Sequence, residues 1–398
     1  MPLALFGLEL SLDTASVDAL EAVARRLDAP QVQAWFDTSS GVEEVALLST
    51  CHRVELVFAF RTLPEGDRWL RWLPVDPGSW KRRTGRELVH HLFEVAAGRK
   101  SLAIGEREVR LQVRSAARST LSRHPRPVVR GLLESAAAAA DEIAPSVPPA
   151  RSIAAVAAGR LLEQVALPFP RVVVVGAGVV GRQLTERLAG SARVTLVYRN
   201  QPPDERFLRS TGARAVPSVR LAEELGVADA LVAAAKSGEP CLGLSDLPPQ
   251  RHLVLVDLGV PRNIDPAVRG TPNIDLLDLG DLWDRRTPSP ADDPAELAIF
   301  DLAERFWARF EVLALESWVD ALRRSTEELR LSELETARPF LGTLTPEQEV
   351  AVERLTQRLV ARILLPPTER LRALPPGPEG ERLRRFALEL LGPTTTDP

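Results

Sequence analysis

Hydrophobic and polar positions alternate over short stretches in the first part of the chain, which is the pattern of half-buried strands. Residues 3–10 predict a first strand, and residues 43–60 predict two strands joined by a sharp bend. Between them, Asp13 or Thr14 is expected to cap a helix that runs to about Leu27. Mixed strands and helices in this order indicate an α+β domain.

Helical periodicity replaces this alternation in the next part of the chain. An apolar face with helical spacing begins near Arg86, and a second helix is predicted from about Gly105 to Ser122. Residues 127–165 are rich in alanine and predict a long connecting helix, which the prolines at 145–149 interrupt. A helix of this kind can separate two domains.

A strand–helix–strand pattern over residues 171–200 is typical of a dinucleotide-binding unit. The glycine fingerprint comprises Gly176, Ala177, Gly178, Val179, Val180 and Gly181. Gly176 permits the tight turn, Gly178 lets the backbone approach a pyrophosphate, and Gly181 allows close helix–strand packing. Arg199 stands where NAD-preferring sites have an acid, and its charge favours the 2′-phosphate of NADPH.

Three further apolar segments, at residues 230–235, 252–259 and 274–277, predict the remaining strands of a parallel sheet. Asp257 lies near the end of the segment at residues 252–259, and Arg262 follows that segment. Ligands bind at the carboxyl ends of strands in open α/β sheets, so this position is a candidate for ligand contact.

The C-terminal part of the chain is predicted to be helical. Residues 287–294 indicate a linker, and Asp293 is expected to cap a long helix with proline at its first position. Thr345 and Gln348 predict a capping box that opens another helix, which we expect to end at residues 365–368. Long helices with apolar faces outside the compact domains favour a homodimer.

Composition narrows the class of protein. A length of 398 residues predicts two or three domains, and 45% hydrophobic with 26% charged residues is typical of globular proteins. No apolar run approaches the ~18–20 residues that span a bilayer, and the N-terminus lacks the features of a secretion signal. Two cysteines without a CxxC pattern fit a reducing cytoplasm, so we expect a cytoplasmic protein without membrane association or a metal site.

The net charge of −4 leaves any nucleic-acid binding to a local basic patch. Arg107, Arg110, Arg114 and Arg118 recur at spacings of three and four, so they share one helix face. Such a face is often merely solvated, but the scarcity of acidic residues among these arginines favours a polyanion such as RNA phosphate.

The predicted bend at residues 50–55 carries the main candidate chemistry. A thiol, an imidazole, a guanidinium and a carboxylate fall within five positions, and positive neighbours favour a thiolate, so Cys51 is a candidate nucleophile. The alternative is a small core residue, because free cysteines are mostly buried. His91 lies on an apolar helix face, where a histidine is more often a satisfied core residue than a catalyst.

These motifs together resemble the glutamyl-tRNA reductase family. The family's Thr-Cys-Asn-Arg-x-Glu motif is similar to residues 50–55. Its His-Leu-Phe-x-Val-Ala-x-Gly-Leu-Asp-Ser…Gly-Glu-Pro-Gln-Ile-x-x-Gln-Val block is similar to residues 91–113. The chain differs from these motifs at His52, at Arg99-Lys100 and at Arg107-Glu108. The nucleotide fingerprint and the helical tail follow in the same order.

The resemblance implies a multidomain α/β fold with three parts. An α+β catalytic domain would cover residues 1–145, a Rossmann NADPH-binding domain with the preceding connecting helix 146–286, and a helical dimerisation domain 287–398. The implied activity is the NADPH-dependent reduction of glutamyl-tRNA to glutamate-1-semialdehyde, the first committed step of five-carbon tetrapyrrole (porphyrin) biosynthesis. The implied assembly is a V-shaped homodimer, and an aminomutase is the implied partner that receives the aldehyde.

The resemblance also implies roles for the matched residues. Cys51 would attack the ester between glutamate and tRNA to form a thioester, Arg53 would hold the glutamyl carboxylate, and His91 would polarise the carbonyl or assist proton transfer. The implied substrate-binding residues are Thr50, His52, Arg53, Glu55, Ser101, Glu106, Arg107, Glu108 and Gln112. The residues implied to bind the cofactor are the fingerprint, residues 176–181, and Arg199.

A second interpretation is a divergent, weakly active relative that binds tRNA or a pathway partner as a regulatory module. The presence of Cys51, Arg53, His91 and the full glycine fingerprint favours the enzyme, because a non-catalytic module needs no such combination. Cys51 and Gly176 are far apart in the sequence, so we expect a swinging nucleotide domain that brings the cofactor to the thiol.

Overall fold

The computed structural model describes residues 3–61, 66, 68–102, 104–125, 127–144, 152–248, 251–284, 294–375 and 378–391. The chain forms two compact units, one comprising Ala4–Glu304 and the other Met1–Leu3 with Arg305–Pro398. The predicted proline break at 145–149 and the predicted linker over 287–293 lie outside the described residues.

The first part of the larger unit is built on an antiparallel sheet of five strands in the order β4-β1-β3-β2-β5. Its strands are β1 (Ala4–Ser11), β2 (Val42–Ser49), β3 (Arg53–Phe60), β4 (Lys81–Thr84) and β5 (Leu121–Ser122). Ser49 of β2 is opposite Val54 of β3, so the predicted sharp bend is the tight connection between these two strands. Cys51 lies in that connection.

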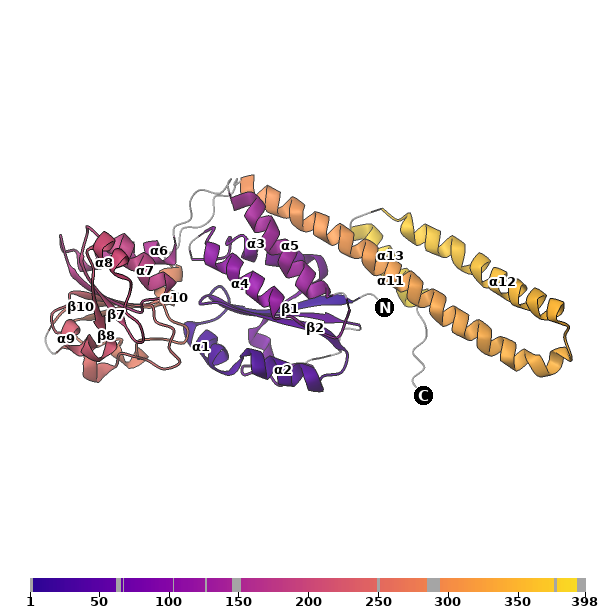
Figure 1. Ribbon diagram of the computed structural model, residues 1–398, viewed down its shortest axis with the longest axis horizontal. Helices are drawn as coiled ribbons and strands as arrows, with labels where there is room; N and C mark the ends of the chain where they lie inside the picture. The colour runs from indigo at the N-terminus through magenta and orange to yellow at the C-terminus, as the bar shows by residue number, and fades with distance from the viewer. Residues whose placement is uncertain are drawn as a thin grey trace. The chain divides into compact units, whose positions relative to one another are not determined.

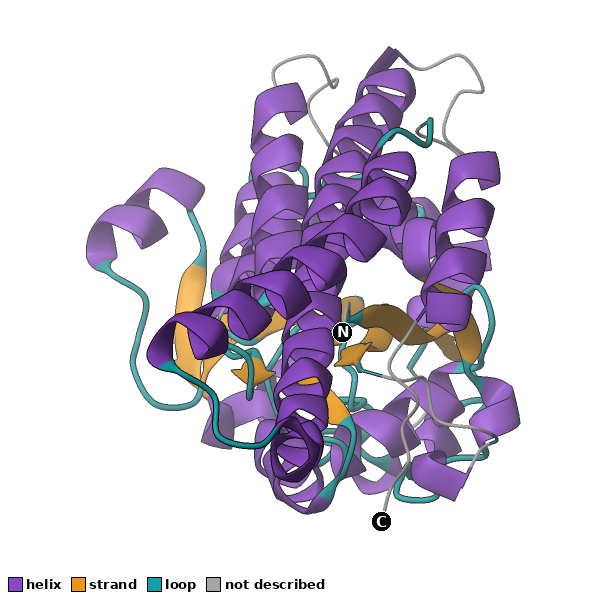
Figure 2. Cartoon of the chain, turned by 90° about the vertical axis from the view of Figure 1, so that its right-hand side faces the viewer, coloured by secondary structure: helices purple, strands orange, loops and turns teal. Residues whose placement is uncertain are grey.

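Helices cover both faces of this sheet (Figures 1 and 2). Those on one face are α1 (Val17–Arg26) and α2 (Ala29–Thr38), and those on the other are α3 (Gly85–Ala96), α4 (Arg107–Arg118) and α5 (Val128–Ile143). The predicted caps of the first helix are wrong: Ser16 caps α1, and its hydroxyl accepts the Ala19 N–H at 3.3 Å. The chain first turns at Ser11, whose N–H binds the Thr14 hydroxyl at 3.2 Å, so the helix begins later.

The second part of the larger unit is a parallel sheet of six strands in the order β11-β10-β9-β6-β7-β8. Its strands are β6 (Arg171–Val175), β7 (Arg193–Tyr198), β8 (Arg214–Pro217), β9 (Ala230–Ala233), β10 (Leu253–Asp257) and β11 (Ile274–Leu277). The accompanying helices are α6 (Ile153–Val165), α7 (Val179–Leu188), α8 (Glu205–Thr211), α9 (Leu221–Leu225) and α10 (Leu279–Asp284). This strand order is that of the Rossmann fold. Successive strands are added on one side of β6 up to β8 and on its other side from β9 onward, so the strand order reverses between β6 and β9.

The predicted long connecting helix is represented by two separate helices, α5 and α6. The first packs against α4 and β2, whereas the second packs against α7 and β10 of the parallel sheet. The long helix of the fold is instead α11 (Pro294–Leu341), which has 48 residues. In the described part of the chain, no helix has both the length and the apolar content that a bilayer crossing requires.

The smaller unit contains the rest of α11 together with α12 (Pro346–Arg372) and α13 (Pro378–Leu391). The predicted capping box of α12 is confirmed: the Thr345 N–H donates to Gln348 Oε1 at 2.9 Å, and the Gln348 N–H donates to Thr345 Oγ1 at 3.4 Å. The predicted end at residues 365–368 is wrong, because α12 continues to Arg372 with two prolines inside it. The buried Leu371 packs in one apolar cluster with Leu315 and Trp318 of α11, which stabilises the last turn beyond the prolines.

Candidate active site

The connection between β2 and β3 is held in one conformation by Thr50. The Thr50 hydroxyl accepts the backbone N–H groups of His52 and Arg53 at 3.1 and 3.2 Å. The Thr50 N–H donates to the Arg53 carbonyl at 2.9 Å, and the Leu12 N–H donates to the His52 carbonyl at 3.0 Å. The polar backbone of the bend is therefore satisfied locally, and Cys51 is presented at its tip.

Beside this bend lies a buried network of charged side chains from the antiparallel sheet. Arg53 Nη1 lies 3.1 Å from Glu55 and 3.7 Å from Glu9, while Arg83 lies 2.8 Å from Glu9. Each of these side chains is almost fully buried. The guanidinium predicted to hold the substrate carboxylate is thus already bound by two carboxylates of the protein.

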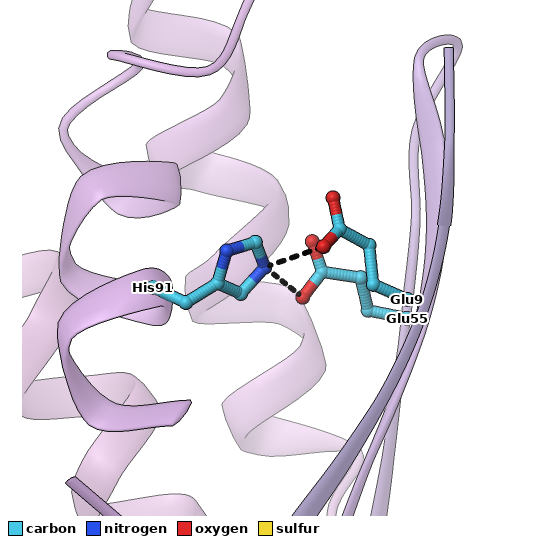
Figure 3. Close-up of side chains that lie close together, drawn as sticks. All are labelled: Glu9, Glu55 and His91. Carbon is cyan, nitrogen blue, oxygen red and sulfur yellow. Dashed lines mark hydrogen bonds and ion pairs between the residues drawn. The ribbon is translucent and has the colours of Figure 1, made fainter. Parts of the chain in front are cut away.

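His91 completes this network from α3, and both of its ring nitrogens have partners. Figure 3 shows the contacts of Nε2 with Glu55 and Glu9. Nε2 lies 3.0 Å from Glu55, and Nδ1 lies 3.1 Å from the ammonium of Lys100. An ammonium group can only donate, so Nδ1 accepts and Nε2–H donates to Glu55. Burial raises the pKa of Glu55, but attraction to His91 and Arg53 outweighs burial and lowers that pKa to about 2.

Glu9, Glu55 and His91 are residue types that ligate metals, and their ligand atoms lie within 4.8 Å of one another. Arg53 and Arg83 already neutralise the two carboxylates at 3.1 and 2.8 Å. A divalent cation would have to displace these guanidinium groups, so the donor set fits an ion-pair network better than a metal centre.

Cys51 opens into a cavity of about 200 Å³. The cavity is lined by Cys51, Glu106, Glu108, Val109, Gln112, Ile153, Val180, Ala234, Ala235 and Leu258. Val180 belongs to the first turn of α7, and Ala234 directly follows β9. The thiol therefore faces the point where the parallel sheet reverses its strand order, which is where ligands bind in such folds. Val180 of the fingerprint thus lines the same cavity as Cys51, and the swing of the nucleotide domain stays a prediction.

Two effects of opposite sign act on the thiol. Burial and the negative charge of Glu106 raise the pKa of Cys51 to about 12, and Arg53 opposes this shift only in part. The role of Cys51 as a nucleophile stays a prediction, and the charge of Arg53 alone does not outweigh burial. Burial, with the negative charge of Glu108, likewise raises the pKa of Glu106 to about 7.

The glycine fingerprint has the geometry that a dinucleotide requires. Gly176 has a φ of +109°, and a Cβ on Gly181 would lie 1.7 Å from the Gly176 carbonyl oxygen. No side chain caps α7 at Gly178, and a Cβ on Gly178 would meet nothing within 4 Å. The helix N-terminus is therefore open to a phosphate group, and Arg199 is exposed just beyond the end of β7. These residues fit a nicotinamide dinucleotide.

Several predicted site residues lie outside the cavity. Ser101 is buried in the turn after α3, whereas Arg107 is exposed on α4. On the predicted arginine face, Arg110 and Arg114 form ion pairs with Asp141 of α5. Part of that face is therefore neutralised within the protein. Fewer of its positive charges are available to bind a polyanion than the sequence spacing alone indicates.

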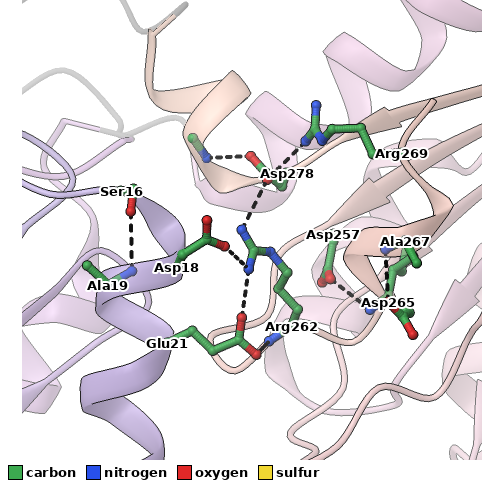
Figure 4. A network of polar contacts seen from close by, with 12 residues as sticks. Ser16, Asp18, Ala19, Glu21, Asp257, Arg262, Asp265, Ala267, Arg269 and Asp278 are labelled. Carbon is green, nitrogen blue, oxygen red and sulfur yellow. Dashed lines mark hydrogen bonds and ion pairs between the residues drawn. The ribbon is translucent and has the colours of Figure 1, made fainter. Parts of the chain in front are cut away.

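The segment after β10 connects the two parts of the larger unit. The Asp257 carboxylate accepts the backbone N–H groups of Gly259, Asn263 and Ile264 at 2.8–2.9 Å. Arg262 extends to α1, where it binds Asp18 at 2.6 Å and Glu21 at 2.8 Å (Figure 4). The position of Asp257 and Arg262 predicts ligand contact, but in the structure both side chains bind other groups of the protein.

Leu258, Ala234 and Ala235 line the cavity although the sequence predictions did not select them. A signal for them was available, because all three lie at the carboxyl ends of predicted parallel strands. Glu9 and Arg83 had no comparable signal, since their importance depends on the pairing of β1 with β3 and β4.

Family models match nearly the whole chain. Residues 8–146 match the glutamyl-tRNAGlu reductase N-terminal domain, and residues 160–284 match the shikimate/quinate 5-dehydrogenase family. Residues 295–393 match the glutamyl-tRNAGlu reductase dimerisation domain.

Proteins with similar sequences are named glutamyl-tRNA reductase. The glutamyl-tRNA reductase of Rubrobacter xylanophilus is 31% identical over 389 residues, covering 89% of each chain. Glutamyl-tRNA reductase 2 of a Nocardioides species is 34% identical over 343 residues, covering 80% of this chain and 75% of the relative. The solved structure of glutamyl-tRNA reductase from Methanopyrus kandleri is 25% identical and covers 98% of this chain and 99% of its own, with a TM-score of 0.45.

Proposed function

This chain belongs to the glutamyl-tRNA reductase family, and we propose that it reduces glutamyl-tRNA to glutamate-1-semialdehyde with NADPH through a thioester on Cys51. This reaction is the first committed step of five-carbon tetrapyrrole biosynthesis. The observation that carries the proposal is the single cavity that Cys51 shares with Val180 of the nucleotide fingerprint. A nucleophile and a hydride donor must meet at one carbonyl carbon in this reaction.

In the first step, Cys51 Sγ attacks the carbonyl carbon of the ester between glutamate and tRNA. The C–S bond forms, the C–O bond breaks, and the tRNA hydroxyl leaves with the proton of the thiol. The fingerprint at the N-terminus of α7 would hold a nicotinamide cofactor, which would supply the hydride. As the thioester carbonyl carbon gains this hydride, its C–S bond breaks and the carbonyl of the aldehyde re-forms. The thiolate of Cys51 that leaves takes up one proton from solvent.

The polar lining of the cavity suits the glutamyl group. Glu106, Glu108 and Gln112 line it from α4, and their oxygens can hold the α-ammonium group of the aminoacyl ester. Arg53 is the proposed partner of the side-chain carboxylate, which it reaches by exchanging Glu9 or Glu55 for the substrate. Because both nitrogens of His91 are engaged, we assign it a positioning role through Glu55.

For the cofactor, Arg199 supports NADPH over NADH, since its guanidinium can pair with the 2′-phosphate. For the assembly, the family's dimerisation domain and the exposed apolar side chains of the smaller unit support a homodimer. On α12 these side chains are Val350, Leu355, Leu359, Ile363 and Leu365. The reactive aldehyde suits direct transfer to an aminomutase, which we propose as a further partner.

A single-turnover assay tests the proposal. Purified chain is mixed with glutamyl-tRNA and NADPH, and semialdehyde is measured after one turnover. Cys51→Ser should form no semialdehyde, whereas Cys241→Ser, which removes the exposed second cysteine, should retain the activity. Full activity of Cys51→Ser would rule out the thioester route.

A further inference from the structure

The imidazole of His52 lies against the sulfur of Cys51. Its Nδ1 is 3.5 Å and its Nε2 3.7 Å from Sγ, and the ring is 1% exposed. The Trp283 ring packs beside it, with centroids 5.3 Å apart, and the Trp283 indole N–H donates to Asp13 at 3.2 Å. The Thr50 hydroxyl accepts the backbone N–H groups of His52 and Arg53, which fixes the backbone that carries Cys51 and His52.

A base beside this sulfur would speed the attack. The raised pKa of Cys51 keeps the thiol protonated at neutral pH, and a thiol is a far weaker nucleophile than a thiolate. His91 is not available for this role, because Glu55 and Lys100 engage both of its nitrogens. Glu106 lines the cavity, but its negative charge opposes ionisation of the thiol.

We propose that His52 is the general base of the reaction: its ring, whose face lies against Sγ, turns about the Cβ–Cγ bond so that one nitrogen accepts the proton of Cys51 Sγ as the sulfur attacks the ester carbonyl. The resulting imidazolium returns that proton to the oxygen of the departing tRNA hydroxyl. After the reduction, the C–S bond breaks with its electron pair on sulfur, and the thiolate is protonated through the imidazole by a proton from solvent. The substrate in this scheme rests on the proposed function, whereas the proton transfer between Sγ and the ring does not.

His52 also distinguishes this chain from the family motif that it resembles, which has asparagine at this position. An amide has no basic nitrogen and cannot accept the thiol proton. The charged groups that act on this pair are Arg53 and Glu106 beside the sulfur and Asp13 behind Trp283. Substitution of His52 alone leaves all three in place.

The pH dependence of thiol alkylation tests the pair without any tRNA. Iodoacetamide is reacted with the full chain in a Cys241→Ser background, so that Cys51 is the remaining thiol. The rate should rise in one step as the imidazole becomes neutral and then reach a plateau. In His52→Asn the step should be lost, and the rate on the plateau should fall by about 100-fold, the scale of general-base catalysis.

Two comparisons keep the test specific. His52→Phe keeps a ring to pack against Trp283 and should also lose the step, while His252→Asn, at an exposed histidine paired with Asp275, should keep it. A step that persists in both His52 variants, with rates within about twofold of the parent, would overturn the proposal. Loss of the step in the alkylation profile of His52→Asn supports His52 as the base even if the parent chain does not reduce glutamyl-tRNA. If His52→Asn reduces glutamyl-tRNA and its alkylation profile is unchanged, only the role of His52 is overturned and the proposed function stands.

Discussion

Glu106 should make the folded protein less stable as the pH rises. Its side chain is buried beside Cys51, and burial together with the negative charge of Glu108 raises its pKa from 4.5 to about 7. A carboxyl group with a raised pKa binds more protons in the folded state, so its contribution to stability is present below about pH 4.5 and is lost by about pH 7. At about 1.36 kcal/mol per pKa unit, the loss is about 3 kcal/mol.

Glu106→Gln removes this titration and keeps the size of the side chain. Relative to the parent, the free energy of unfolding of the variant should increase by about 3 kcal/mol between about pH 4.5 and about pH 8. Urea unfolding followed by tryptophan fluorescence at several pH values measures this difference. Glu134→Gln, at an exposed position of α5, is the control and should show no such increase. If the difference in free energy of unfolding between Glu106→Gln and the parent does not change with pH, the raised pKa of Glu106 is refuted.

Three further substitutions test the cofactor site and the contact of Arg262 with α1. Arg199→Glu should weaken NADPH binding by at least about tenfold and leave NADH nearly unchanged in titrations, since a charge-assisted bond contributes about 1.5–3 kcal/mol; equal losses would contradict the 2′-phosphate assignment. Gly181→Ala places a Cβ 1.7 Å from the Gly176 carbonyl, so it should weaken both cofactors alike, whereas Gly131→Ala, whose Cβ meets nothing within 4 Å, should bind them normally. Arg262→Gln removes ion pairs to Asp18 and Glu21, so amide hydrogen exchange in α1 should accelerate; unchanged exchange would show that the contact does not hold the helix.

The elements that the sequence predicts best have local causes. The strand–bend–strand around Cys51 follows from alternating apolar residues, and β2 and β3 confirm it. The fingerprint at residues 176–181 follows from backbone conformations and contacts that glycine suits best, which the φ of Gly176 bears out. The Thr345 capping box is likewise a signal within one helical turn.

The chemistry of the site depends on contacts between distant segments, which the sequence pattern does not contain. Arg53 beside Cys51 favours a thiolate, but burial of the thiol and the charge of Glu106, which is distant in the sequence, outweigh it. The cavity forms only where residues of α4 meet the carboxyl ends of the parallel strands, so the sequence does not show that Val180 lines the same cavity as Cys51. Two prolines within α12 show the same limit, since packing of Leu371 outweighs a local helix-breaking signal.

The thioester route requires Cys51 to carry the glutamyl group at the cavity that receives the cofactor. The chain is mixed with glutamyl-tRNA in the absence of NADPH, quenched in acid and analysed by mass spectrometry, and NADPH is added to a parallel sample. We expect a glutamyl adduct on Cys51 with release of tRNA, followed by loss of the adduct as semialdehyde when NADPH is added. Semialdehyde formation at the full rate, with no adduct on Cys51 at any time, would contradict the thioester route.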